Sequence, residues 1–110
     1  MAPVTYLIVF DVAPERRAEF LELLAGVLDA MRSEPTFHEA ILHRDPAHDN
    51  RFMLYETWAS HEDVVEVQLQ RPYRERWHRA LPRLLQRDRA ITIWEPMRSD
   101  RAQPRPMIGG

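Results

Sequence analysis

Two segments of this chain, Val4–Phe10 and Phe52–Trp58, are apolar at nearly every position instead of at every second position. Both are rich in β-branched and aromatic residues, which favours β-strands. A strand with one face in water alternates apolar and polar residues, whereas a strand covered on both faces does not. The chain must therefore form a sheet whose two faces are both covered.

Glu56 is the exception within the second of these segments. In a strand, Phe52, Leu54, Glu56 and Trp58 share one face, because alternate side chains point to opposite faces. Burying an unpaired carboxylate is costly. Glu56 therefore needs an arginine, a histidine or backbone donors, from its own chain or from a partner. The sequence leaves open which face of the sheet it occupies.

Helical segments separate the strands. Apolar residues at three- and four-residue spacing, opened by a proline at a favourable first position, predict a helix over Pro14–Met31. Ser60 with Asp63 three residues later resembles a capping box and predicts a short helix. Pro72 opens a further helix, which Pro82 should kink or split.

The remaining strands complete a recognisable order. Phe37–Arg44 and Ala90–Trp94 have strand composition, and the turn-forming residues of Asp45–Asn50 predict a hairpin into the strand that follows. The order strand, helix, strand, strand, helix, strand, with right-handed crossovers, gives a four-stranded antiparallel sheet with helices on one face. We therefore predict an α+β, ferredoxin-like fold.

This fold leaves one sheet face without helices, although the strands are apolar on both faces. An exposed apolar face of this size marks an interface, so we predict a homodimer that packs sheet against sheet. The domain should span residues 1–97. Residues 98–110 are rich in proline and arginine and should form a flexible C-terminal arm.

Composition excludes several classes of chemistry. The chain has no cysteine and no lysine, so thiolate nucleophiles, cysteine-ligated metals and Schiff bases are absent. Its three glycines form no phosphate-binding loop. A net charge of −2 gives no attraction to nucleic acid or to anionic membranes. With no membrane-spanning run and no secretion signal, we expect a cytoplasmic location.

Four motifs resemble the antibiotic biosynthesis monooxygenase family: "EPTFHEAILHRDPAHDNRF", "YETWAS", "RPY" and "ITIWEP". The resemblance covers roughly residues 4–97. It implies a dimeric α+β barrel built from ferredoxin-like subunits. It also implies oxidation of a small aromatic molecule, such as a quinol or a polyketide-type phenol, by molecular oxygen without metal or flavin. One branch of the family degrades haem and uses an axial histidine on the later helix, close to which His78 falls.

Such an oxidation requires a base that deprotonates a phenol and an apolar pocket that holds the resulting anion. His78 is the leading candidate base, because histidine titrates near neutral pH and this residue lies at the edge of an apolar stripe. Trp58 is predicted to stack on a flat substrate. The full set of candidates is, for catalysis, His78, Trp58 and Tyr73 and, for the substrate pocket, Tyr6, His38 and Trp77.

Several alternatives stay open. The candidate aromatic residues are equally suited to core packing, and the protein can be a ligand-binding dimer without catalysis or a haem-binding enzyme. The histidines lack the spacing of a metal site, so no metal is expected. The six arginines of the later helix are most simply a solvated face: Arg71, Arg74, Arg76, Arg79, Arg83 and Arg87.

Overall fold

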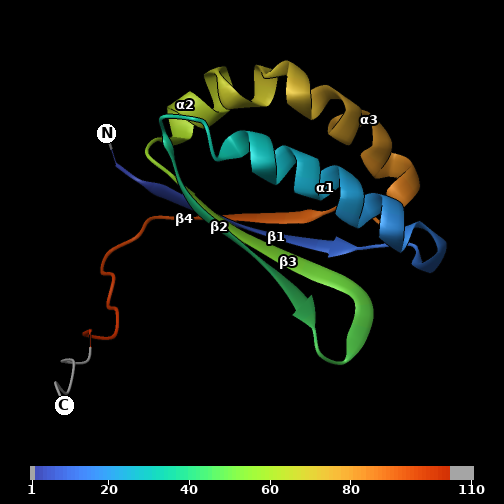
Figure 1. Cartoon of the computed structure of the whole chain (residues 1–110). Helices are drawn as coiled ribbons and strands as arrows, with labels where there is room; N and C mark the ends of the chain where they lie inside the picture. Colours follow the sequence, from blue (N-terminus) through green and yellow to red (C-terminus); the bar gives the residue numbers. More distant parts are fainter. Residues whose placement is uncertain (1, 105–110) are drawn as a thin grey trace, which may run out of the picture.

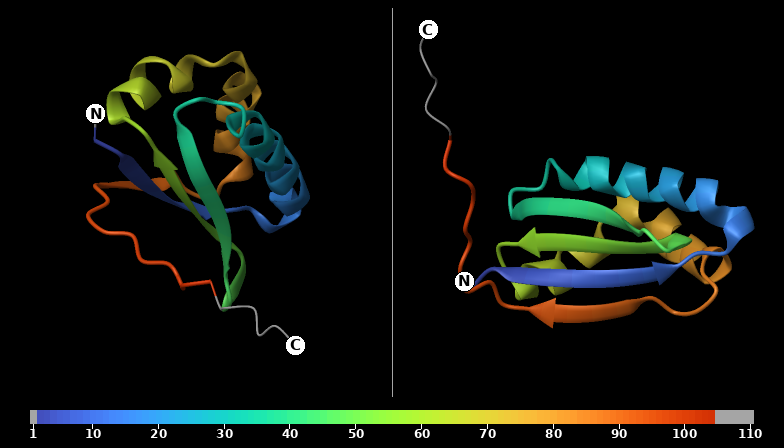
Figure 2. Two further views of the ribbon diagram at one scale, coloured as in Figure 1. Left: turned by 60° about the vertical axis from the view of Figure 1, so that its left-hand side comes forward. Right: turned by 90° about the horizontal axis from the view of Figure 1, so that it is seen from below.

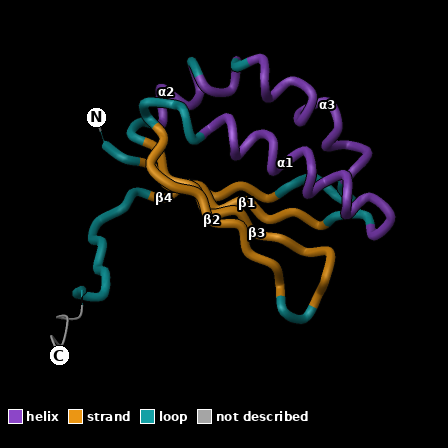
Figure 3. The backbone as a smooth tube through the Cα atoms, viewed as in Figure 1, coloured by secondary structure: helices purple, strands orange, loops and turns teal. Residues whose placement is uncertain are grey.

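The computed structural model describes residues 2–104. In chain order the elements are β1 (Val4–Asp11), the 3₁₀ helix η1 (Pro14–Arg16), α1 (Arg17–Met31), β2 (Phe37–Asp45), β3 (His48–Trp58), α2 (His61–Glu66), the 3₁₀ helices η2 (Gln68–Gln70) and η3 (Pro72–Arg74), α3 (Glu75–Leu84) and β4 (Ala90–Trp94) (Figures 1 and 3).

The four strands form one antiparallel sheet in the order β2-β3-β1-β4, and the helices lie over one of its faces (Figures 1 and 2). The predicted α+β, ferredoxin-like fold is confirmed. Residues 98–104 of the predicted arm have no helix or strand, and Figure 1 shows this segment running away from the sheet beyond β4. Residues 105–110 of that arm, and Met1, lie outside the described residues.

The core lies between the sheet and the helices, and Phe20 of α1 is at its centre. The Phe20 ring is fully buried, and its centroid lies 5.1 Å from that of Phe10, 5.3 Å from that of Phe52 and 5.5 Å from that of Trp77. These residues come from both helices and both central strands. The aromatic cluster therefore fixes the position of α1 and α3 on the sheet.

Local sequence signals explain most of the helix ends. Ser60 caps α2, because its Oγ accepts a hydrogen bond from the backbone N–H of Asp63 at 3.3 Å, as the sequence predicts. Pro72 opens η3, from which α3 continues. The helix is not split at Pro82 but runs through it to Leu84.

The β2–β3 hairpin is longer and its turn tighter than the sequence predicts. The Asp45 side chain accepts a hydrogen bond from the backbone N–H of Ala47 at 2.8 Å, and Asp45 pairs with His48. This side-chain-to-backbone turn extends β3 back to His48. The predicted six-residue turn thus contains strand residues.

The sheet face turned away from the helices is largely apolar. Along the centre of this face, Leu7, Val9, Met53 and Tyr55 are half-buried. Towards its edges Ile41 is 47% exposed and Trp94 is 56% exposed. No helix of the described residues covers this face (Figure 2). We call it the open face, and the opposite one the covered face.

Candidate functional site

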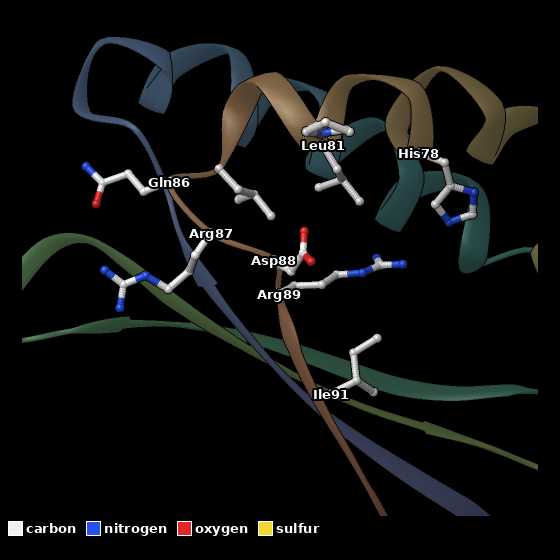
Figure 4. A pocket seen from close by; sticks show the side chains of 9 residues that line it. His78, Leu81, Gln86, Arg87, Asp88, Arg89 and Ile91 are labelled. Atoms are coloured by element: carbon white, nitrogen blue, oxygen red, sulfur yellow. The ribbon is translucent and has the colours of Figure 1, made fainter.

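A cavity of about 490 Å³ opens between α3 and the segment that leads into β4. Figure 4 shows His78 and Arg89 reaching towards one another across it, with Ile91 beneath. We call this cavity the α3–β4 pocket. It is lined by His78, Leu81, Pro82, Leu85, Gln86, Arg87, Asp88, Arg89 and Ile91.

Helical and strand periodicity place these side chains. Trp77, Leu81 and Leu84 form the buried side of α3, and His78 lies at its edge and is half-buried. Arg89 and Ile91 are two residues apart in the segment that enters β4. Because every second residue of a strand points to the same face, both side chains point to the covered face. Because β4 is an edge strand that α3 only partly covers, Ile91 stays 46% exposed and the pocket stays open.

Behind the pocket, Glu56 and Tyr6 lie side by side on the covered face. Glu56 of β3 pairs with Tyr6 of β1, which pairs with Ile93 of β4. Glu56 is only 6% exposed, and its Oε1 accepts a hydrogen bond from the indole Nε1 of Trp58 at 3.2 Å. The donor that Glu56 requires therefore comes from its own strand.

Burial and neighbouring charges set the protonation of this site. Burial raises the pKa of Glu56, against the opposing effects of the Trp58 hydrogen bond and the charges of Arg74 and Arg89. Burial, reinforced by the same two arginines, lowers the pKa of His78 below its usual 6.5. His78 is therefore a neutral imidazole at pH 7 and is able to accept a proton.

Tyr6 connects this region to α2. Its hydroxyl lies 2.7 Å from Nδ1 of His61 in a hydrogen bond. Burial, and secondarily the charge of Glu56, raises the pKa of Tyr6 to about 12. Tyr6 therefore stays a neutral phenol at physiological pH.

Arg74 departs from the predicted solvated face of the later helix. It is 6% exposed, and its guanidinium lies over the rings of Trp58 and Tyr73, at 5.6 and 5.5 Å from their centroids. The sequence carries a signal for this position, because Arg74 precedes Trp77 and His78 by three and four residues and so shares their side of the helix. Of the other five arginines, Arg71 is half-buried and Arg76, Arg79, Arg83 and Arg87 are exposed.

The structure separates the remaining candidates from His78. Tyr73 donates a hydrogen bond to Glu34 at 3.3 Å and, with Trp77, lines a different cavity, of about 280 Å³, between α1 and α3. His38 is exposed at an irregularity in the pairing of β2 with β3. Trp58 is fully buried. The residues brought together are thus Tyr6 and Trp58 around Glu56, and His78 with Arg89.

Residues 2–104 show neither clustered metal ligands nor a membrane-spanning helix. No group of three or more histidine, cysteine, aspartate and glutamate side chains in this range is placed to hold a metal ion. None of its helices combines the length and the apolar character that crossing a membrane requires.

Residues 3–80 match the family model described as antibiotic biosynthesis monooxygenase. The chain belongs to this family. The match includes β1 to β3, α2 and the part of α3 that carries His78. The family resemblance that the sequence motifs indicate is thereby confirmed.

Two curated relatives match over most of the chain. An uncharacterised protein of Synechocystis, sll1783, is 27% identical over 84 residues, which are 76% of this chain but only 56% of that protein. A protein of Pestalotiopsis microspora named as a candidate monooxygenase, GME11364, is 32% identical over 89 residues, which are 78% of this chain and 72% of that one. The chain thus spans little more than half of the first relative.

Two solved structures share the fold. The Rv0793 protein of Mycobacterium tuberculosis superposes with a TM-score of 0.81 at 20% identity, covering 89% of this chain and 98% of that one. A point mutant of SnoaB from Streptomyces nogalater, described as a cofactor-independent oxygenase, gives 0.76 at 22% identity, with 90% and 97% covered. At these identities the likeness is one of fold.

Proposed function

We propose that this protein is a homodimeric monooxygenase that oxidises a small aromatic molecule, a quinol or polyketide-type phenol, with molecular oxygen and without a cofactor. The observation that carries the proposal is the geometry of the α3–β4 pocket. There the neutral imidazole of His78 faces the guanidinium of Arg89 across a cavity that both apolar and polar side chains line. Family membership supports the same reaction class.

The reaction needs a base, a site for an anion and access for oxygen. His78 removes the phenolic proton, and the phenolate passes one electron to oxygen. The resulting radical and superoxide combine at a ring carbon that bears hydrogen, ortho or para to a hydroxyl group. Loss of water from the peroxide leaves a quinone. Overall, one substrate and one oxygen molecule give one quinone and one water, and the quinone formed from a quinol carries an additional hydroxyl group.

Arg89 has the second role in this reaction. Its cation lies across from His78, where it stabilises the phenolate that forms when the proton leaves. Leu81 and Ile91 provide apolar walls for an aromatic ring. Burial lowers the pKa of His78, and the charge of Arg89 adds to this effect, so Arg89 assists the base before the reaction as well as the anion after it.

The dimer is part of the proposal because the open face is apolar. Leu7, Val9, Met53 and Tyr55 form a continuous apolar centre on adjacent strands. Packing this face against a second copy removes it from water and covers both faces of β1 and β3, as their sequences require. Each subunit then keeps its own α3–β4 pocket on the side away from the partner.

Turnover of His78→Ala tests the proposal. We expect kcat/KM for a hydroquinone to fall by roughly 10²- to 10⁴-fold, the usual contribution of a general base. His48→Ala is the matched control, because His48 is exposed in the β2–β3 hairpin and does not line the α3–β4 pocket. If His78→Ala keeps wild-type turnover while remaining folded, the proposed base is wrong.

Haem binding is the second candidate function. It is favoured by one observation: His78, a neutral imidazole that would hold the haem iron, lines an open cavity beside Arg89, which would pair with a propionate. Titration of the protein with haem distinguishes the two functions. A Soret band that His78→Ala abolishes supports haem binding, and an unchanged spectrum of free haem excludes it. A tightly bound aromatic ligand without product supports a non-catalytic role instead.

A further inference from the structure

Arg74 is a buried cation with free hydrogen-bond donors. Within residues 2–104, neither its Nε nor its Nη2 has a hydrogen-bond partner, although the residue is only 6% exposed. The rings of Trp58 and Tyr73 lie against its guanidinium. Cation–π contacts of this kind contribute up to about 2 kcal/mol but satisfy no N–H group.

Unsatisfied donors at this depth are costly. A buried polar group without a partner costs roughly 1–3 kcal/mol, and a charged one costs more. Glu56 does not supply an acceptor for Arg74. Its carboxylate accepts the indole N–H of Trp58 and lies more than 4.0 Å from the guanidinium nitrogens, which is too far for an ion pair. A different acceptor is therefore needed to complete this site.

The two nitrogens of Arg74 that lack a partner are the pair with which arginine side chains commonly bind a carboxylate. Nε and Nη2 lie along one edge of the guanidinium, and their N–H groups point in parallel from that edge. A carboxylate accepts two such parallel bonds at once, with one oxygen on each. The unpartnered edge of Arg74 thus has the shape of a carboxylate-binding group.

The surrounding charge also favours an anion. Arg89 forms no ion pair with a carboxylate of the described residues, and the charges of Arg74 and Arg89 both act on His78 and Glu56. Two guanidinium groups therefore share a single buried carboxylate. An anionic group on the ligand would balance this excess of positive charge.

We propose that Arg74 binds a carboxylate carried by the aromatic substrate, so that the substrate class is a hydroxylated aromatic acid. This inference rests on the proposed function, in which the hydroxyl group of the same molecule meets His78. Arg74 and His78 are four residues apart, hence on the same side of the chain and about 6 Å apart along the helix axis. That separation is on the scale of one aromatic ring with substituents at both ends. Arg74 itself does not line the α3–β4 pocket, so the ligand must extend from the pocket past His78 to reach its guanidinium.

Anaerobic binding of a matched ligand pair tests the proposal. The probes are 2,5-dihydroxybenzoate and its neutral analogue 2,5-dihydroxybenzamide, with affinity measured by calorimetry or by the fluorescence of Trp58 and its neighbours. We expect the acid to bind the wild-type protein roughly ten- to a hundredfold more tightly than the amide, as for hydrogen bonds to charged groups. Equal affinity for the two, or no binding of the acid, would overturn the proposal.

Arg74→Gln assigns the preference to this residue. It should remove most of the discrimination between the acid and the amide. Arg76→Gln is the control, because Arg76 is exposed on the same helix and lines the cavity on the α1 side. If Arg74→Gln still binds the acid more tightly than the amide, the carboxylate of the ligand binds elsewhere. If Arg74→Gln fails to fold, Arg74→Lys keeps the positive charge but lacks the two parallel N–H donors. It should also lose most of the preference for the acid over the amide.

Turnover separates this proposal from the one on which it rests. Binding of the acid under nitrogen does not depend on oxidation, so tight binding without oxygen uptake contradicts the proposed function alone. Oxidation of a quinol without a carboxylate at the same kcat/KM as the acid contradicts the role of Arg74 alone.

Discussion

The covered and open faces of the sheet carry different kinds of side chain. Under the helices the strands place a carboxylate, Glu56, and a phenol, Tyr6, next to the aromatic core. The open face has apolar residues at its centre, including Leu7 and Tyr55. A sheet that served only as the core of a monomer would show the opposite distribution, with polar groups towards water.

We therefore propose two roles for the two faces of this sheet. Buried polar groups are costly and are kept where they bind or react. Uncovered apolar surface is costly in water and is kept where another surface covers it. The chemistry is therefore expected under α3 and the assembly on the open face.

Truncation of the core should give the largest loss of stability. Phe20→Ala removes the fully buried ring that contacts Phe10, Phe52 and Trp77, and should lower the free energy of unfolding by about 3–5 kcal/mol. Denaturant titration at several protein concentrations measures it. On the open face, Tyr55→Ala should instead give a loss that depends on protein concentration, as for a residue stabilised by a partner. A loss for Tyr55→Ala that is the same at every protein concentration would contradict a partner on the open face.

A charge on the open face should disrupt assembly. Leu7→Arg puts a cation at the centre of the predicted interface, where it has no acceptor, and should weaken dimerisation by roughly a hundredfold or more. Sedimentation velocity measures this change. Ala25→Glu, an exposed substitution on α1, is the control. A wild-type protein that sediments as a stable monomer at micromolar concentration would contradict the interface itself.

Neutralising Glu56 should stabilise the protein at neutral pH. The pKa of Glu56 is raised in the folded state, so the folded protein binds more protons than the unfolded one above the ordinary value of 4.5. Stability attributable to this group therefore falls as the pH rises through that window. Glu56→Gln keeps an acceptor for the Trp58 indole and should unfold at higher denaturant than wild type at pH 7. The stabilities of wild type and Glu56→Gln should converge below pH 4.5. If Glu56→Gln is still more stable there, the raised pKa of Glu56 is not the cause.

The smallest expected effect is in the pH dependence of kcat/KM. Activity requires unprotonated His78, whose pKa is lowered, so activity should fall only at a pH below 6.5. Arg89→Gln removes one of the cations that lower this pKa and should move the acid limb to higher pH, whatever its effect on the maximal rate. If Arg89→Gln leaves the acid limb at the same pH, Arg89 does not influence the pKa of the base.

Much of the fold follows from local patterns. The non-alternating strands, the helical stripe of α1 and the Ser60 cap predict the element order, and short right-handed connections then leave few topologies. The turn at Asp45 is shorter than its composition predicts, because a side-chain hydrogen bond that composition does not reveal tightens it. Local patterns thus predict the elements, whereas individual hydrogen bonds between side chains and backbone fix where they end.

The site is less predictable because it depends on pairing across the sheet. His78 is identified by its type and its place at the edge of an apolar stripe. Sequence patterns do not identify Arg89, since its direction depends on the start of β4, and they group Arg74 with the exposed arginines of its helix. That Glu56 faces the helices follows from the register of β1 with β3, which no local pattern specifies.

Oxygen consumption by the wild-type protein tests the central claim most directly. Protein treated with a metal chelator and shown to be free of flavin and haem is mixed with a panel of hydroquinones and hydroxylated aromatic acids in an oxygen electrode, and the product is quantified by chromatography. We predict one oxygen molecule consumed for each quinone formed, at a rate proportional to protein concentration and unaffected by the chelator. No oxygen uptake with any member of the panel, or uptake that follows residual metal content, would contradict the account.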